Sequence, residues 1–222
     1  MNSLEPLLDG FESMLLKPRG NQLGRIDDLL TGFEQIPQTA RTGPFNTFSL
    51  LGVEYDELAH SRFLGWLLDP ASAHGQGTRF LARFLGLLGR TVPPEAMQKT
   101  RVYLEFAEQE SIIDIMVWIP GELLVYVENK VLAGEGNQQA YRELRDLRRT
   151  GLRYRLPPSK QMAVFLTPGG RRPSSGDGDS WHALSYGQLS SGFMEVLPEV
   201  SEPKLCFLIE DWLQTIERFA GG

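Results

Sequence analysis

Cysteine is nearly missing from this sequence of 222 residues. Cys206 stands alone, which excludes an internal disulfide and any metal site built from several cysteines. The sequence also has no run of ~20 apolar residues, the length that a membrane-spanning helix needs. Its first residues, Met-Asn-Ser-Leu-Glu-Pro, show neither the basic nor the apolar region of a signal peptide. We therefore expect a cytoplasmic protein with no membrane partner.

An excess of positive charge is missing as well. Lysine and arginine number 22 against 28 acidic residues, a formal net charge of −6, which argues against nucleic-acid binding over the whole surface. The distribution is uneven, however, because nine basic residues and two acidic ones lie between Gln138 and Ser175. Such a segment can attract a polyanion. A solvated helix face explains the same run of charge, and the sequence leaves both explanations open.

The first 44 residues differ from the rest of the chain. Apolar residues recur there at helical spacing, from Leu4 to Leu15 and from Leu23 to Ile36. A stretch rich in proline, threonine and glycine follows, typical of a connector. We predict an N-terminal helical extension over residues 1–44 and a second domain over residues 45–222. The pattern does not say whether the extension caps that domain, forms a homodimer or binds another partner.

The second part of the chain alternates between helical and β-type patterns. Helical spacing predicts helices over residues 56–68 and 77–88, and β-branched and aromatic runs predict a three-strand meander. Another helix, two short strands and two closing helices follow. The predicted strands are residues 102–106, 112–119, 123–128, 163–167 and 181–184. This order indicates an α/β sandwich, with a mixed central sheet of roughly four to five strands flanked by helices.

The hairpin between the second and third predicted strands brings charged residues together. If residues 120–122 form a three-residue loop, strand pairing places Asp114 directly opposite Glu128. Opposed side chains share one face of the sheet, with Cβ atoms about 5 Å apart. Lys130 is two residues beyond Glu128 and shares that face too. Two carboxylates and one ammonium thus converge on one patch.

The repulsion between the carboxylates makes such a patch unfavourable unless it serves a function. Two carboxylates at this distance repel each other, and the pKa of one rises unless a cation lies between them. Lys130 compensates only one of them. A hard divalent cation, Mg²⁺ or Mn²⁺, resolves the conflict and activates water for attack on a phosphodiester. Lys130 would orient that water or stabilise developing charge. A cross-strand salt bridge on a solvated sheet face is the simpler alternative.

A series of short motifs resembles the PD-(D/E)XK nuclease superfamily, and one bacterial branch of it closely. That branch typically has a Glu-x-x-His-Ser helix, Leu-Leu-Asp-Pro, His-Gly-x-Gly, Phe-Leu, Ile-Asp-Ile, Glu-Asn-Lys and a glutamine-bearing helix. The matching segments here are Glu57 to Ser61, Leu67 to Pro70, His74 to Gly77, Phe80-Leu81, Ile113 to Ile115, Glu128 to Lys130 and Gln139. Each motif is weak alone, whereas their shared order over residues 57–139 is specific.

The resemblance implies a restriction-endonuclease-like αβ sandwich and a metal-dependent deoxyribonuclease that hydrolyses DNA. Asp114, Glu128 and Glu57 correspond to the metal ligands, with Mg²⁺ or Mn²⁺ as the expected cofactor. Lys130 corresponds to the catalytic lysine. Gln139 corresponds to the glutamine that positions the lysine or the DNA. Phage defence, mobile-element biology and DNA repair are the expected settings, and the sequence does not choose among them.

Two positions depart from the family pattern. An arginine often stands two residues before the central aspartate, where this chain has Ile112. A tyrosine often stands four residues after the glutamine, where this chain has Glu143. Both departures concern DNA contacts near the site more than the metal ligands. We expect the histidines of the motifs, His60 and His74, to pack helices and anchor loops rather than to act on the substrate.

Arginines on the helix after the catalytic strand suggest a track for DNA. Arg142, Arg145 and Arg149 are spaced i, i+3 and i+7, on a different face from the apolar residues of that helix. We expect them to contact phosphates of the bound DNA. The alternative from another functional class is a catalytically silent DNA-binding or assembly protein that retains the fold. A homodimer is a further option, because two nicks make a double-strand break.

Overall fold

The computed structural model describes residues 45–131, 134, 136, 138–175 and 178–220. The chain divides into two compact units, residues 1–45 and 46–222, and every element described here belongs to the second. The predicted helical extension over residues 1–44 lies outside the described residues, and the domain boundary after residue 44 stays a prediction. Among the described residues, no helix combines the length and the apolar character needed to cross a membrane.

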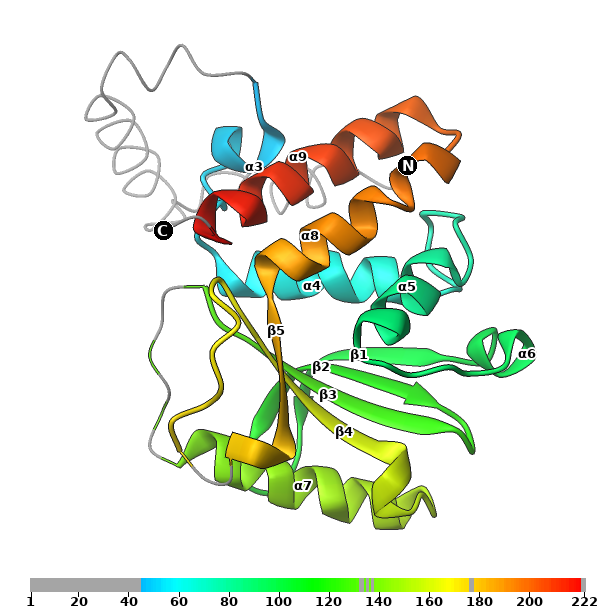
Figure 1. Cartoon of the computed structure of the whole chain (residues 1–222), viewed down its shortest axis with the longest axis vertical. Helices are drawn as coiled ribbons and strands as arrows, with labels where there is room; N and C mark the ends of the chain where they lie inside the picture. The colour runs from blue at the N-terminus through cyan, green and yellow to red at the C-terminus, as the bar shows by residue number, and fades with distance from the viewer. Residues whose placement is uncertain (1–44, 132–133, 135, 137, 176–177, 221–222) are drawn as a thin grey trace, which may run out of the picture. The chain divides into compact units, whose positions relative to one another are not determined.

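A mixed sheet of five strands forms the centre of the second unit (Figure 1). Its strands stand in chain order: β1 (Arg101–Ala107), β2 (Ile112–Ile119), β3 (Leu123–Asn129), β4 (Gln161–Thr167) and β5 (Trp181–Ser185). The first three pair antiparallel as a meander, and β4 and β5 run parallel to β3. Helix α7 (Gln139–Arg153) connects β3 to β4. The predicted α/β class and mixed sheet are confirmed.

Helices cover both faces of the sheet (Figure 1). Helix α7 lies on one face, and the opposite side carries α4 (Glu57–Leu68), α5 (Arg79–Leu87), α8 (Tyr186–Met194) and α9 (Pro203–Ala220). Short segments complete the unit: α3 (Thr47–Leu50), α6 (Pro94–Met97), and the 3-10 turns η2 (Pro158–Lys160), η3 (Gly178–Ser180) and η4 (Leu197–Glu199). The helical spacing of the sequence predicts the first closing helix over about residues 186–197, but this helix, α8, ends at Met194.

Alternation along the strands divides the core into two parts. Val125 and Val127 belong to the larger apolar cluster, with the helices opposite α7. Leu124 and Tyr126 belong to the smaller cluster, with the apolar residues of α7. Successive strand residues point to opposite faces, so the even-numbered residues of β3, including Glu128, point to the α7 face.

The β2–β3 hairpin has the predicted register. From the loop at residues 120–122, the pairing runs in step as far as Ile115 and Val127. The next position along both strands places Asp114 opposite Glu128. The period of two and the loop length together determine this arrangement, because a slip of one residue would turn every apolar side chain of the strand to the wrong face.

Helix α4 begins where the sequence predicts because Asp56 caps it. The Asp56 carboxylate accepts hydrogen bonds from the backbone N–H groups of Leu58 (2.9 Å) and Ala59 (3.1 Å), which have no carbonyl partner within the helix. The cap makes Glu57 the first helical residue. Its side chain then reaches the chain as it leaves β3, where Glu57 Oε1 accepts from the backbone N–H of Val131 (3.2 Å).

The two histidines of the motifs, His60 and His74, form hydrogen bonds within the core and to nearby backbone. His60 is 1% exposed; its Nδ1 accepts from the Trp212 indole (3.1 Å), and its Nε2 donates to the carbonyl oxygen of Glu54 (2.8 Å). His74 Nε2 lies 3.1 Å from the carbonyl oxygen of Asp69. Burial lowers the pKa of both imidazoles, so each is neutral at pH 7 and serves in packing.

Candidate active site

Four elements bring the predicted site residues together. Glu128 lies near the C-terminal end of β3, and Lys130 follows directly after that strand. Asp114 is the β2 residue one step beyond the Ile115–Val127 pair, so the continued register puts it opposite Glu128. Glu57 is the first residue of α4 and Gln139 the first of α7. Residues distant in the sequence therefore meet at one end of β3, where side chains of both helical layers reach the sheet.

Lys130 links the acidic residues of this group. Its Nζ lies 2.7 Å from Glu128 Oε1 and 3.7 Å from Glu57 Oε2. Gln139 Nε2 donates to the same oxygen of Glu128, at 2.6 Å. The side chain of Glu128 is 2% exposed and that of Lys130 13%, so the group is largely shielded from bulk water. Charge interactions are stronger in such surroundings than at the surface.

Asn129 points away from this group and holds the strand against the helices. Its backbone N–H donates to Asp114 Oδ2 (2.8 Å). Its side-chain amide donates to Ser61 Oγ on α4 (3.0 Å) and accepts from the Tyr186 hydroxyl on α8 (2.7 Å). The backbone of Asn129 thus orients Asp114, while its side chain fixes β3 to two helices. The sequence motifs contain these residues, but only their packing reveals the role.

Burial and mutual repulsion disturb the ionisation of the opposed carboxyls. Burial, and next the charge of Glu128, raise the pKa of Asp114 to about 7. Burial also raises the pKa of Glu128, against the opposing effect of the Lys130 ammonium. Burial disfavours the charge of Lys130, but Glu128 and then Glu57 raise its pKa above the usual value. Two carboxyls that resist joint ionisation beside one ammonium form a site short of positive charge.

The opposed pair fits a divalent cation. Oε2 of Glu128 is buried and accepts no hydrogen bond from an N–H or hydroxyl group within the described part of the chain, and the carboxyl of Glu143 is the neighbour that interacts with Glu128 from α7. In those same ranges, no group of three or more His, Cys, Asp or Glu side chains is arranged to hold a metal ion. Mg²⁺ is commonly held by one or two carboxylates together with water and phosphate. Asp114 and Glu128 would supply such a pair of carboxylates, and metal ligation by these two residues and by Glu57 stays a prediction.

Glu143 is a further acidic residue here, which the sequence marked only as a departure from the family pattern. It is 1% exposed, and its carboxyl interacts with the side chains of Gln139 and Glu128. Burial, and next the charge of Glu128, raise its pKa to about 9. Its spacing of four residues from Gln139 was the available signal, because residues i and i+4 share a helix face.

Glu143→Gln is expected to make the metal-free protein less sensitive to alkaline pH. The unfolded chain loses this proton near pH 4.5, whereas the folded protein keeps it to about pH 9. The stability from this group is therefore complete below about pH 4.5 and is lost progressively as the pH rises to about 9. Urea unfolding in EDTA, from about pH 5 to about pH 9, should show a smaller loss for the variant. Glu95→Gln, at an exposed position, is the control, and equal pH dependence of both variants would contradict this account of Glu143.

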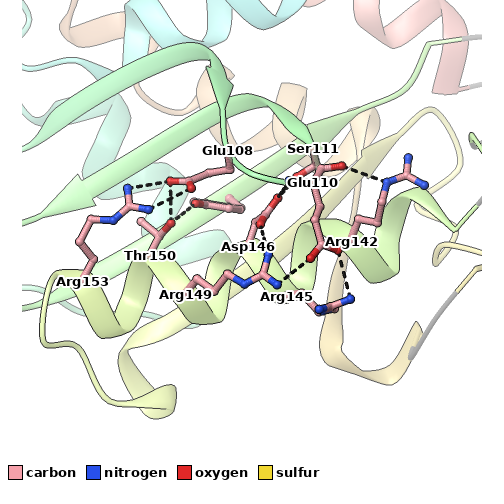
Figure 2. Close-up of polar contacts among 10 residues, drawn as sticks. Glu108, Glu110, Ser111, Arg142, Arg145, Asp146, Arg149, Thr150 and Arg153 are labelled. Atoms are coloured by element: carbon pink, nitrogen blue, oxygen red, sulfur yellow. Dashed lines mark hydrogen bonds and ion pairs between the residues drawn. The ribbon is translucent and has the colours of Figure 1, made fainter.

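The arginines predicted to contact DNA lie on α7 beside acidic residues of the β1–β2 connection (Figure 2). Arg145 Nη1 lies 3.2 Å from Glu110 Oε2, and Arg149 Nη2 lies 2.6 Å from Glu110 Oε1. Arg142 Nε donates to the carbonyl oxygen of Glu110 (3.1 Å). The predicted basic face exists, but it is not a bare cationic track. The charge count over residues 138–175 missed Glu110 because this residue comes from another part of the chain.

An open pocket of about 450 Å³ joins this connection to the start of α7. Its lining residues are Glu108, Gln109, Glu110, Ser111, Ile112, Gln139, Arg142 and Glu143. Gln139 also donates to Glu128, so the pocket adjoins the pair of opposed carboxyls. A ligand in this pocket would lie beside the candidate active site.

Comparison with known proteins identifies the family of this chain. A family model described as the PD-(D/E)XK nuclease superfamily matches residues 45–214, a range that includes all five strands and every site residue named above. No curated protein and no solved structure gives a significant match. The mixed five-stranded sheet flanked by helices is consistent with the restriction-endonuclease-like fold. The chain therefore belongs to the PD-(D/E)XK nuclease superfamily.

Proposed function

We propose that the protein is a divalent-metal-dependent nuclease that hydrolyses the phosphodiester bonds of DNA. The observation that carries this proposal is the opposed pair Asp114 and Glu128, with the Lys130 ammonium 2.7 Å from Glu128. Membership of the superfamily supports nuclease chemistry in general. Arg142 of α7, which lines the pocket beside this pair, supports a nucleic acid as the substrate, and Arg145 and Arg149 lie farther along the same helix.

The opposed carboxylates would hold the metal ion. Asp114 and Glu128 supply oxygen ligands, which suit Mg²⁺ or Mn²⁺. When bound, this ion supplies Lewis-acid activation of water and neutralises charge on the phosphate. The backbone N–H of Asn129 keeps Asp114 in place (2.8 Å), and Gln139 keeps Glu128 in place (2.6 Å). Because both carboxylates are already oriented, little reorganisation is needed when the substrate arrives.

Lys130 would act on the substrate itself. An ammonium has three hydrogen-bond donors and no acceptor. It can therefore hold the attacking water by its oxygen, or stabilise negative charge on a non-bridging phosphate oxygen. Glu57, with Oε2 3.7 Å from Nζ and Oε1 bound to the backbone of Val131, orients the ammonium from the α4 side.

A catalytically silent DNA-binding or assembly protein is the second candidate, and one observation favours it. The Lys130 ammonium, 2.7 Å from Glu128, already compensates the charge of that carboxylate. For the active nuclease we propose a cytoplasmic setting in phage defence, mobile-element biology or DNA repair. A homodimer would let two sites cut both strands.

Incubation with supercoiled plasmid and with circular single-stranded DNA tests the proposal. With Mg²⁺ or Mn²⁺, the protein should convert DNA to nicked, linear or shorter products, and excess EDTA should stop the reaction. An RNA of similar length, treated in the same way, shows whether the activity is selective for DNA. Binding of DNA without metal-dependent cleavage would contradict the nuclease and support the silent protein.

A further inference from the structure

The β1–β2 connection places two glutamates on α7 in different surroundings (Figure 2). We call residues 108–111 the acidic turn. Its backbone is fixed by Asp146 of α7, whose carboxylate is fully buried. Asp146 Oδ2 accepts from the backbone N–H of Glu110 (3.0 Å) and from the Ser111 hydroxyl (2.7 Å). The position of the acidic turn therefore does not depend on the Glu110 side chain.

Of the two glutamates, Glu108 is the one whose carboxylate stays bound to α7. Its side chain is 4% exposed, and both of its oxygens accept from the Arg153 guanidinium, each at 3.0 Å. Thr150 also donates to it (2.9 Å), and Thr150 in turn accepts from the buried Tyr126 hydroxyl (2.8 Å). A buried carboxylate held in this way is expensive to separate from its partners, so Glu108 is part of the fold.

Glu110 is bound quite differently. Its carboxylate is 24% exposed and lies between two guanidiniums, those of Arg145 (45% exposed) and Arg149 (33%). Ion pairs that water reaches contribute little to stability. Two guanidiniums that converge on one carboxylate also have the geometry that binds a phosphate through several charge-assisted hydrogen bonds. Another anion can therefore take the place of the Glu110 carboxylate at small cost.

The location of Arg145 and Arg149 indicates which anion would replace the Glu110 carboxylate. The acidic turn and Arg142 line the pocket of about 450 Å³ that ends at Gln139, and Gln139 donates to Glu128 of the candidate active site. A nucleic-acid strand whose scissile phosphate lies at that site would carry its neighbouring phosphates along the pocket. A nucleic-acid strand carries regularly spaced phosphates, and a row of arginines is suited to bind them.

We propose that Glu110 is a built-in competitor for a phosphodiester of the substrate strand, and that Arg145 and Arg149 form the phosphate site from which the strand displaces it. This inference rests on the proposed function for the nature of the ligand. Bound to Glu110, the two arginines are partly neutralised, which weakens their hold on unrelated polyanions. A strand aligned in the active site displaces Glu110, because its other contacts add to the exchange.

Glu110→Gln is the test variant. Glutamine keeps the size of the side chain, and the bonds of Asp146 keep the acidic turn in place. Removal of the competing charge should tighten DNA binding about fivefold at about 0.1 M salt and should steepen the dependence of log K on log salt by about 0.7, the value for one phosphate contact on a single strand. The probe is a fluorescein-labelled single-stranded oligonucleotide in EDTA, measured by fluorescence anisotropy at several salt concentrations.

Glu122→Gln is the matched control. Glu122 pairs with Lys160 (3.2 Å) at an exposure of 38%, so the variant makes the same change in net charge at a comparable surface pair. Equal affinities of Glu110→Gln and Glu122→Gln for the oligonucleotide would overturn the proposal. The proposal would also be overturned if Glu110→Gln still tightened oligonucleotide binding after Arg145 and Arg149 had both been replaced by alanine. Glu110→Ala is the second variant, to be used if glutamine disturbs the thermal unfolding curve.

The outcomes separate this inference from the proposed nuclease function. Binding is measured in EDTA and needs no cleavage. Tighter binding by Glu110→Gln in a protein that never cleaves DNA would support the phosphate site and contradict the nuclease. Metal-dependent cleavage together with unchanged binding by the variant would support the nuclease and contradict the role of Glu110.

Discussion

Asp114→Asn is expected to abolish metal-dependent DNA cleavage and, at the same time, to make the metal-free protein more stable. Metal ions contribute several kcal/mol to such catalysis, and each ~1.4 kcal/mol is a factor of ten in rate, so cleavage should fall by roughly a thousandfold. Stability should rise because the amide removes one of two buried, repelling carboxyls. Burial and the charge of Glu128 raise the pKa of Asp114 to about 7, and the amide oxygen can still accept the N–H of Asn129.

Two measurements check the opposite signs of these effects. The cleavage rate is measured on plasmid DNA, and the free energy of unfolding in urea with EDTA at about pH 8, where the Asp114 carboxyl would otherwise be ionised. Asp179→Asn is the matched control, because the side chain of Asp179 is 94% exposed in the loop after β4. Wild-type cleavage by Asp114→Asn would remove Asp114 from the site, and a less stable variant would show that the carboxyls do not repel.

Lys130→Met is expected to destabilise the metal-free protein by about 3–5 kcal/mol, the usual effect of leaving a buried charge without its partner. Methionine keeps much of the side-chain length but leaves Glu128, 2% exposed, without the ammonium at 2.7 Å. Mg²⁺ should restore part of the loss, because an ion that binds only the folded state stabilises it. Cleavage should fall by about a hundredfold or more, as when a group that stabilises transition-state charge is removed.

Urea unfolding in EDTA and in Mg²⁺ measures the loss and its recovery. Lys160→Met is the control, since Lys160 and Glu122 are 39% and 38% exposed, and such a pair contributes at most about 1 kcal/mol. This control should show no response to Mg²⁺ beyond that of the wild type. Equal stabilisation of both variants by Mg²⁺ would argue against a cation site at Glu128.

The sheet could be predicted in detail because its first half is local. Three antiparallel strands joined by short connections leave few alternatives, and the three-residue loop at 120–122 determines the register of β2 and β3. The helix predicted between the third and fourth strands agrees with their parallel pairing, because parallel neighbours need a crossover connection. Helix ends were less certain, as at Met194, because fraying and 3-10 turns depend on the surroundings.

The site was predictable where residues are linked by strand geometry, and less so where they come from different layers. Asp114, Glu128 and Lys130 follow from the hairpin alone. Glu57 and Gln139 were expected at the site only through the resemblance to the superfamily, because nothing in a helical pattern says which end of which strand a helix reaches. The structure brings both to Glu128 or Lys130.

The local sequence pattern therefore determined the strands, their antiparallel pairing and the opposed carboxyls. The two-residue period of the side chains and the length of the hairpin loop both depend only on residues close together in the chain. Tertiary structure alone decided the surroundings of those charges. The burial that raises the pKa of Glu143 and the approach of Glu110 to Arg145 and Arg149 both bring together residues from distant segments. Solvation and long-range charge pairing depend on every layer that covers a residue, and no spacing along the chain records them.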